Sequence, residues 1–159
     1  MIWGAIWIRG RSNIVFMEQD SYSKKEGYSA GSYISVLDDQ LPRCWEPGMT
    51  FMQDNAPIHK AARTIKWFED HGIPVLDWPP YSPDLNPIEH VWVMLKQWIN
   101  EKYPELRYMG TSDEDYDRLC AVIEEAWDAL DQEKIDNLIR SMPRRVKAVI
   151  HALGWHTRY

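Results

Sequence analysis

QDNAPIHKA at residues 53–61 and WPPYSPDLNPIEHVW at residues 78–92 are the two stretches that decide the fold. In the first, a short apolar run ends at Asp54 before a loop and a helix, which predicts a strand with an acid at its end. In the second, four prolines fall within ten residues, which predicts an ordered loop without helix. Apolar residues then recur at helical spacing, so we expect a long helix that begins at about Pro87 and carries Glu89 in its first turn.

Before these stretches the sequence predicts strands and then a helix from about Ser32, whose apolar positions include Tyr33; after them it predicts only helices. Residues 2–8 and 13–18 are apolar, β-rich runs around an Arg-Gly-Arg break, which is typical of a hairpin. Beyond the long helix the spacing is helical throughout, and the first later helix follows a capping serine, Ser112. We therefore expect a mixed α/β domain with its core over 1–103 and an all-helical extension of the same domain over 104–159.

The composition excludes several classes of protein. With 159 residues, 45% hydrophobic and 26% charged, the chain has the balance of one globular domain rather than of a disordered segment. No apolar run approaches the roughly 20 residues of a membrane span, and the opening MIWGAIWI lacks the basic leader of a signal peptide. Cys44 and Cys120 cannot form a disulfide framework, so we expect free thiols in a reducing compartment and a protein that is not secreted.

The net charge of −6 hides an uneven distribution of charged residues. Residues 113–136 hold ten acidic and two basic side chains, whereas residues 140–159 hold five Lys or Arg and no acid. A solvated helix face is the plain interpretation of the basic end. The functional interpretation is an arm that contacts DNA phosphates through Arg144, Arg145 and Lys147.

The two acids also have purely structural explanations. Asp54 could cap the helix that follows it, and NPIE at 86–89 has the form of a capping box in which Glu89 reaches back. His59 and His90 flank the acids and could bind metal or phosphate, although a lone histidine is more often structural. The chain has no P-loop, dinucleotide or G-x-S-x-G motif, and hence no sign of a nucleotide cofactor or a serine nucleophile.

The two opening stretches resemble the signatures of the mariner-type DDE transposase superfamily. The 34 residues between Asp54 and Glu89 match the separation of the second and third catalytic carboxylates in one branch of that superfamily. WGAI at 3–6, SMPRR at 141–145 and GWHTRY at 154–159 extend the resemblance over nearly the whole chain.

The resemblance implies a ribonuclease H-like fold, a mixed sheet flanked by helices, in which three carboxylates hold two Mg²⁺ or Mn²⁺ ions. It makes Asp54 and Glu89 catalytic metal ligands, and it places Asn55 and His59 along the site. Carboxylates suit these ions, because Mg²⁺ prefers hard oxygen donors. Two such ions can activate an attacking oxygen and stabilise the leaving oxygen of an in-line phosphoryl transfer.

The implied activity is that of a DNA endonuclease and transposase. Water first cuts DNA at the ends of the mobile element, and the freed 3′ hydroxyl then attacks target DNA, with no covalent enzyme intermediate. The implied partners are transposon ends, target DNA and further copies of the chain in a dimer or larger complex. Neither a membrane nor a small-molecule cofactor is implied, and in a eukaryotic host the location would be nuclear.

One departure from the superfamily pattern affects the expected activity. The first catalytic Asp lies on a strand upstream of the one that residues 3–6 resemble, and no residue here matches it. We therefore expect a catalytic-domain fragment with its first strand missing and its activity impaired. Two alternatives stay open: a non-catalytic DNA-binding or self-associating module that uses the basic stretch 140–158, and a complete enzyme that uses another acid, such as Asp20 or Asp77.

Overall fold

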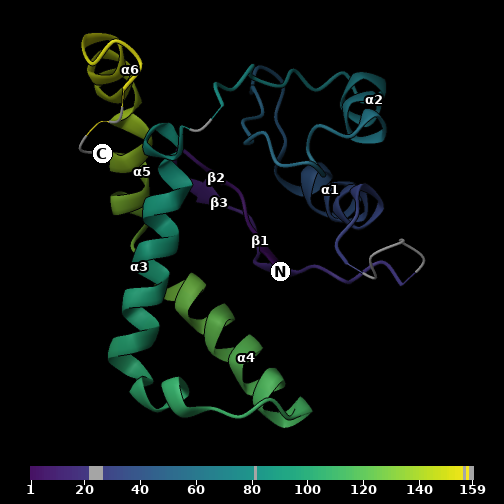
Figure 1. Cartoon of the computed structure of the whole chain (residues 1–159), viewed down its shortest axis with the longest axis vertical. Helices are drawn as coiled ribbons and strands as arrows, with labels where there is room; N and C mark the ends of the chain where they lie inside the picture. The colour runs from purple at the N-terminus through teal and green to yellow at the C-terminus, as the bar shows by residue number, and fades with distance from the viewer. Residues whose placement is uncertain (22–26, 81, 156, 158–159) are drawn as a thin grey trace. The chain divides into compact units, whose positions relative to one another are not determined.

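The computed structural model describes residues 1–21, 27–80, 82–155 and 157, and it divides into two compact units (Figure 1). The N-terminal unit comprises Met1–Gly4 and Arg11–Tyr81, and the C-terminal unit comprises Ala5–Gly10 and Ser82–Tyr159. Each unit has its own buried apolar residues, so each is described by itself.

The N-terminal unit combines a small antiparallel sheet with two helices. Its secondary structure consists of β1 (Ile2–Trp3), β4 (Val15–Phe16), α1 (Ala30–Cys44) and α2 (Ala62–Asp70). Ile2 pairs with Phe16 and Trp3 with Val15, while Phe51 and Val75 form an isolated parallel bridge. Helices α1 and α2 pack together over a buried apolar core made of Trp3, Tyr33, Leu37, Leu41, Trp67 and Phe68.

The ends of both helices follow from local sequence. The hydroxyl of Ser29 caps α1 by accepting hydrogen bonds from the backbone N–H groups of Gly31 and Ser32, at 3.0 and 3.2 Å. Helix α2 ends at Asp70 with His71 as its C-cap, and Gly72 takes the left-handed conformation (φ 63°) that favours glycine just beyond a helix.

The C-terminal unit is mainly helical. Strand β2 (Ile6–Trp7) pairs with β3 (Gly10–Arg11), of which Gly10 belongs to this unit, in a second two-stranded sheet. The helices of the unit are η1 (Pro83–Leu85), α3 (Pro87–Lys102), η2 (Pro104–Tyr108), α4 (Asp113–Ala129), α5 (Gln132–Arg140) and α6 (Met142–His151), where η denotes a 3₁₀-helix. Figure 1 shows α3 with α4 and α5 beside it, and α6 packs against α5 and η1.

The core of the C-terminal unit lies where α3, α4 and α5 meet. Trp127 is 1% exposed and stacks on Trp92 with ring centroids 5.4 Å apart. Val91, Ala126 and Ile135, one from each of these three helices, are fully buried. Because α3 is held along its length in this way, the position of its N-terminal turn, which carries Glu89, is fixed relative to the rest of the unit.

The mixed α/β class is confirmed, but the extent of the sheet is not as predicted. The described residues contain two separate two-stranded sheets and one isolated bridge rather than one mixed sheet. The predicted strand 2–8 is interrupted at Gly4 and Ala5, and the run before Asp54 pairs only at Phe51. An apolar run predicts extended backbone, whereas a strand also needs a hydrogen-bonded partner along its length.

Beyond residue 103, the described residues form helices and the turns that join them, as the sequence indicates. None of the described helices is long and apolar enough to cross a membrane.

Candidate functional site

Asp54 lies in an extended segment just after the Phe51 bridge, at the start of a tight turn. Its Oδ1 atom accepts a hydrogen bond from the backbone N–H of Ala56 at 2.9 Å, which closes an Asx-type turn. The side chain remains 56% exposed. Helix α2 begins only at Ala62, with Ala61 as its N-cap, so Asp54 does not cap that helix.

His59 lies directly against the carboxylate of Asp54. Its Nδ1 atom is 2.6 Å from Oδ1 of Asp54, and the imidazole is only 18% exposed. Oδ1 is therefore engaged twice, by His59 and by the backbone of Ala56. Among the described residues no hydrogen bond is made to Oδ2, so one oxygen of this carboxylate is oriented while the other is accessible to a ligand.

Tyr33 supports His59 from helix α1. The two rings lie 4.5 Å apart at their centroids, and the hydroxyl of Tyr33 donates a 2.7 Å hydrogen bond to Oε1 of Gln53, the residue before Asp54. Tyr33 is 1% exposed, and this burial is the main cause that raises the pKa of its hydroxyl. Sequence reasoning placed Tyr33 only in the apolar stripe of a helix, because spacing does not reveal which side chain it meets.

Asn55 joins the two stretches that decide the fold. Its Nδ2 atom donates a 2.8 Å hydrogen bond to the backbone carbonyl of Trp78, a buried residue at the start of the proline-rich stretch. The structure therefore brings the predicted residues Asp54, Asn55 and His59 together in one loop. Asn55 fixes the loop, and His59 fixes the carboxylate.

Glu89 is exposed in the first turn of α3. Asn86 caps this helix by accepting a 3.3 Å hydrogen bond from the backbone N–H of Ile88, and Pro87 occupies the first helical position. Among the described residues the carboxylate of Glu89 accepts no hydrogen bond, so it does not reach back as in a capping box. It therefore stays available to a ligand.

The described residues include no group of three or more His, Cys, Asp or Glu side chains placed to hold a metal ion. Asp54 and Glu89 belong to different compact units, so each is described within its own unit. Both are exposed carboxylates with at least one accessible oxygen, and that donor chemistry fits Mg²⁺ or Mn²⁺.

The basic C-terminal stretch divides into exposed and buried cations. Arg144 and Lys147 are exposed on α6. Arg145 is 2% exposed, and its guanidinium donates hydrogen bonds to the Ser141 hydroxyl and to the Asp84 carbonyl, each at 2.8 Å. The prediction that Arg145 contacts DNA phosphates does not fit this placement, because its charged group is already enclosed by protein.

Burial, and then the positive charge of Arg145, lower the pKa of His90. This histidine is therefore less suited than an ordinary one to bind phosphate as a cation.

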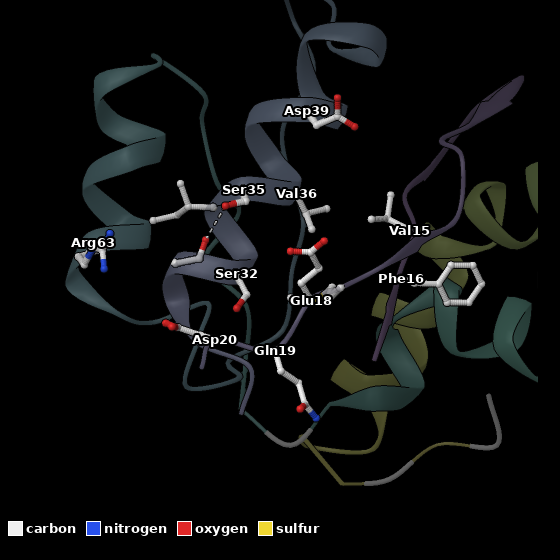
Figure 2. Close-up of a pocket in the computed structure, with 13 residues that line it drawn as sticks. Val15, Phe16, Glu18, Gln19, Asp20, Ser32, Ser35, Val36, Asp39 and Arg63 are labelled. Carbon is white, nitrogen blue, oxygen red and sulfur yellow. Dashed lines mark hydrogen bonds between the residues drawn. The ribbon is translucent and has the colours of Figure 1, made fainter. Parts of the chain in front are cut away.

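A separate hollow of about 680 Å³ lies between β4 and α1 (Figure 2). Its lining includes Asp20, one of the two acids named above as alternative catalytic residues. Oδ2 of Asp20 accepts a 2.7 Å hydrogen bond from the hydroxyl of Ser29, the residue that caps α1. The side chain of Asp20 thus has a structural partner, and neither Asp54 nor Glu89 lines this hollow.

Comparison with known proteins places this chain in a family. Residues 13–110, more than half of the chain, match the family described as DDE superfamily endonuclease. The transposable element Tc1 transposase of Caenorhabditis elegans is 42% identical over 112 residues, which cover 70% of this chain and 38% of that protein. The Tcb1 transposase of Caenorhabditis briggsae is 39% identical over 75% of this chain and 39% of its own length. The Tc3 transposase of C. elegans is 30% identical over 97% of this chain and 44% of its own length.

The chain therefore spans about two fifths of the length of these relatives. Among solved structures, the catalytic domain of Mos1 transposase with raltegravir and Mg has a TM-score of 0.68 to this chain at 20% identity, and it matches 99% of this chain and 83% of that one. The catalytic domain of Mos1 mariner transposase has a TM-score of 0.63 at 19% identity, with 99% and 82% covered. These likenesses show a shared fold. This chain belongs to the DDE superfamily of endonucleases, and Tc1/mariner transposases are its relatives over most of its length.

Proposed function

We propose that Asp54 and Glu89 are metal ligands of a DDE site that cuts DNA at the ends of a mobile element and joins it to target DNA. The observation that carries the proposal is the way in which the Asp54 carboxylate is held by its neighbours. His59 and the Ala56 amide hold one of its oxygens, and the other is accessible. The names of the relatives, all transposases, support the same activity.

The metal in this proposal is Mg²⁺ or Mn²⁺, with two ions in the complete site. The Mos1 transposase catalytic domain has been solved with raltegravir and Mg and with raltegravir and Mn. Hard carboxylate oxygens are suitable donors for either ion. Oδ2 of Asp54 and the carboxylate of Glu89 would hold the metal, which would polarise the reacting phosphate oxygens. The other residues act on the ligands: His59 orients Asp54, and Asn86 fixes the turn that carries Glu89.

The wider context of the site is also proposed. The core over 1–103 would form the ribonuclease H-like catalytic part, and 104–159 would be its helical extension. The substrates would be transposon ends and target DNA, bound by a dimer or larger assembly, in the nucleus of a eukaryotic host. Within these 159 residues only two of the three expected carboxylates have a match, so we propose that the 159-residue chain alone is impaired in catalysis.

The test combines metal binding with DNA cleavage by the 159-residue chain. Mn²⁺ affinity is measured by isothermal titration calorimetry, and cleavage is measured as nicking of supercoiled plasmid in Mn²⁺. We expect weak Mn²⁺ binding that Asp54→Asn and Glu89→Gln each reduce, together with nicking near background. Glu101→Gln on the same helix α3 is the matched control for Glu89, and Asp70→Asn on α2 is the control for Asp54.

Three outcomes would change this assignment. Unchanged Mn²⁺ affinity in both Asp54→Asn and Glu89→Gln would remove the proposed ligands. Robust nicking that Asp54→Asn abolishes would overturn the proposed impairment. Robust nicking that only Asp20→Asn or Asp77→Asn abolishes would favour a site built on another acid.

A second candidate function is a non-catalytic DNA-binding module. It is favoured by the exposed cations Arg144 and Lys147 on α6, which lie one turn apart on the same helix face. Salt-dependent DNA binding without any Mn²⁺ binding or nicking would support this alternative over the first.

A further inference from the structure

Asp84, in the short helix η1, is held by two segments that lie far along the chain. Its backbone carbonyl accepts a 2.8 Å hydrogen bond from Nη1 of Arg145. Its Oδ2 atom accepts two hydrogen bonds from Thr157, one from the hydroxyl at 2.8 Å and one from the backbone N–H at 3.2 Å. Arg145 thus holds the backbone of Asp84, and Thr157 holds its side chain.

The same guanidinium group of Arg145 is also bonded to Ser141, the residue between α5 and α6. Its Nε atom donates a 2.8 Å hydrogen bond to the hydroxyl of Ser141, which in turn donates to the backbone carbonyl of Leu138 in α5. Arg145 and Ser141 are 2% and 6% exposed. A buried guanidinium with several hydrogen bonds has little conformational freedom. The position of Asp84 is therefore tied to the positions of α5 and α6.

The turn that contains Asp84 leads directly to Glu89. The backbone N–H of Asn86 donates to the carbonyl of Pro83 at 3.0 Å, and the N–H of Glu89 donates to the carbonyl of Asn86 at 3.2 Å. Pro83 and Pro87 restrict the backbone between these bonds. Leu85, Asn86 and Pro87 are buried, so the end of the turn is packed against protein, whereas Glu89 is exposed.

We propose that Arg145 and Thr157 are positioning residues for Glu89, and that they fix its carboxylate by holding Asp84. The proposal rests on the proposed function, because it assumes that Glu89 is a metal ligand. Neither residue touches the metal in this proposal: their effect passes through Asp84 and the turn that caps α3. Arg145 and Thr157 are therefore part of the scaffold of the site. In this proposal Arg145 supports the turn before Glu89 and does not contact DNA.

The sharpest test uses Thr157, because it is only partly buried and its hydroxyl can be removed without changing its shape. Thr157→Val keeps the size of the side chain and the backbone N–H but loses the hydroxyl bond to Asp84. Thr157→Ser keeps the hydroxyl and serves as the rescue variant. Arg145→Met would test the other arm, but loss of a buried cation risks unfolding, so Thr157 carries the decision.

Two quantities are measured on the 159-residue chain, each alongside the fraction folded by circular dichroism. Mn²⁺ affinity should fall about threefold to tenfold in Thr157→Val and return to the original value in Thr157→Ser. This fall is smaller than the one expected when a metal ligand loses its direct hydrogen-bond partner. Hydrogen exchange at the backbone N–H of Glu89 should become faster in Thr157→Val and return to the original rate in Thr157→Ser.

The control that separates this inference from the proposed function is Glu89→Gln. If Glu89→Gln weakens Mn²⁺ binding while Thr157→Val leaves affinity and exchange unchanged, the positioning role is overturned and the ligand role of Glu89 stands. If Glu89→Gln leaves Mn²⁺ affinity unchanged, the proposed function fails first, and the positioning role fails with it.

Discussion

The Nδ1 atom of His59 lies 2.6 Å from Oδ1 of Asp54, and the ring of His59 rests against the buried ring of Tyr33. A histidine that is backed by a buried aromatic side chain has a restricted ring orientation. The carboxylate that it meets is restricted in turn. Such ordering before a ligand arrives is what a metal site requires of its protein ligands.

His59→Ala should weaken Mn²⁺ binding by about tenfold or more, as loss of the direct partner of a ligand usually does. Asp54 would keep the backbone bond from Ala56, so its loop should persist. The matched control is His71→Ala, in the same unit, where the imidazole stacks on Trp67. Calorimetric titration with Mn²⁺ measures both variants, and equal affinities in the two would contradict a role of His59 at Asp54.

Tyr33→Phe should make stability less dependent on pH in alkaline solution. Burial raises the pKa of the Tyr33 hydroxyl above its ordinary value of about 10. Below about pH 10 its contribution to the free energy of unfolding is fully present; above it the unfolded chain loses a proton that the folded chain keeps, so this free energy falls as the pH rises. The fall between about pH 9 and 11, measured by urea unfolding, should be smaller in Tyr33→Phe.

Tyr108→Phe is the control for this experiment, because Tyr108 is 90% exposed. It should retain the full alkaline loss of stability. At neutral pH, Tyr33→Phe should also cost about 1 kcal/mol, since Gln53 loses a hydrogen bond in a buried setting. An identical pH profile for Tyr33→Phe and the unaltered chain would show that the Tyr33 hydroxyl ionises as in an unfolded chain.

Ser112→Ala should lower the free energy of unfolding by about 1 kcal/mol. The hydroxyl of Ser112 accepts a hydrogen bond from the N–H of Asp115 at 3.1 Å, and the Asp115 carboxylate accepts one from the N–H of Ser112 at 3.2 Å. Ser35→Ala, inside α1, is the control: its hydroxyl caps no helix end, and alanine there favours helix. Urea unfolding of both variants decides whether the cap contributes as expected.

Local signals in the sequence were sufficient to predict where two helices of the C-terminal unit begin. Asn86 with Pro87 marks the start of α3, and Ser112 marks the start of α4, because these residues satisfy exposed backbone groups within one turn. The placement of Asp54 beside His59 is also local, since five residues separate the two in one loop.

Contacts between distant segments could not be predicted from spacing or composition. Arg145 and Arg144 are adjacent and identical in type, yet the first is buried and the second is exposed. Their difference depends on which face of α6 meets η1, which no charge pattern reveals. The sheet was overestimated for a related reason, because the apolar run 2–8 carries no information about the partner with which it pairs.

The exposed cations of α6 give the last prediction, which concerns DNA. The logarithm of DNA affinity falls as the logarithm of salt concentration rises, and each phosphate contact makes this fall steeper by about 0.9, because it releases a counterion. If Arg144 and Lys147 both contact phosphates, the double variant Arg144→Ala with Lys147→Ala should make the fall shallower by roughly 2. The control double variant, Arg118→Ala with Lys134→Ala, removes the same charge from the acidic stretch 113–136.

Fluorescence anisotropy with a labelled duplex, repeated over a range of salt concentrations, measures these slopes. The control should leave the slope near that of the unaltered chain, because acidic neighbours keep Arg118 and Lys134 from phosphates; Arg118, for example, already pairs with Glu105 at 2.6 Å. A change of net charge alone would act on both double variants equally. Equal slopes in the two would therefore show that α6 makes no direct phosphate contact, whereas a loss confined to Arg144 and Lys147 would locate the contact on that helix.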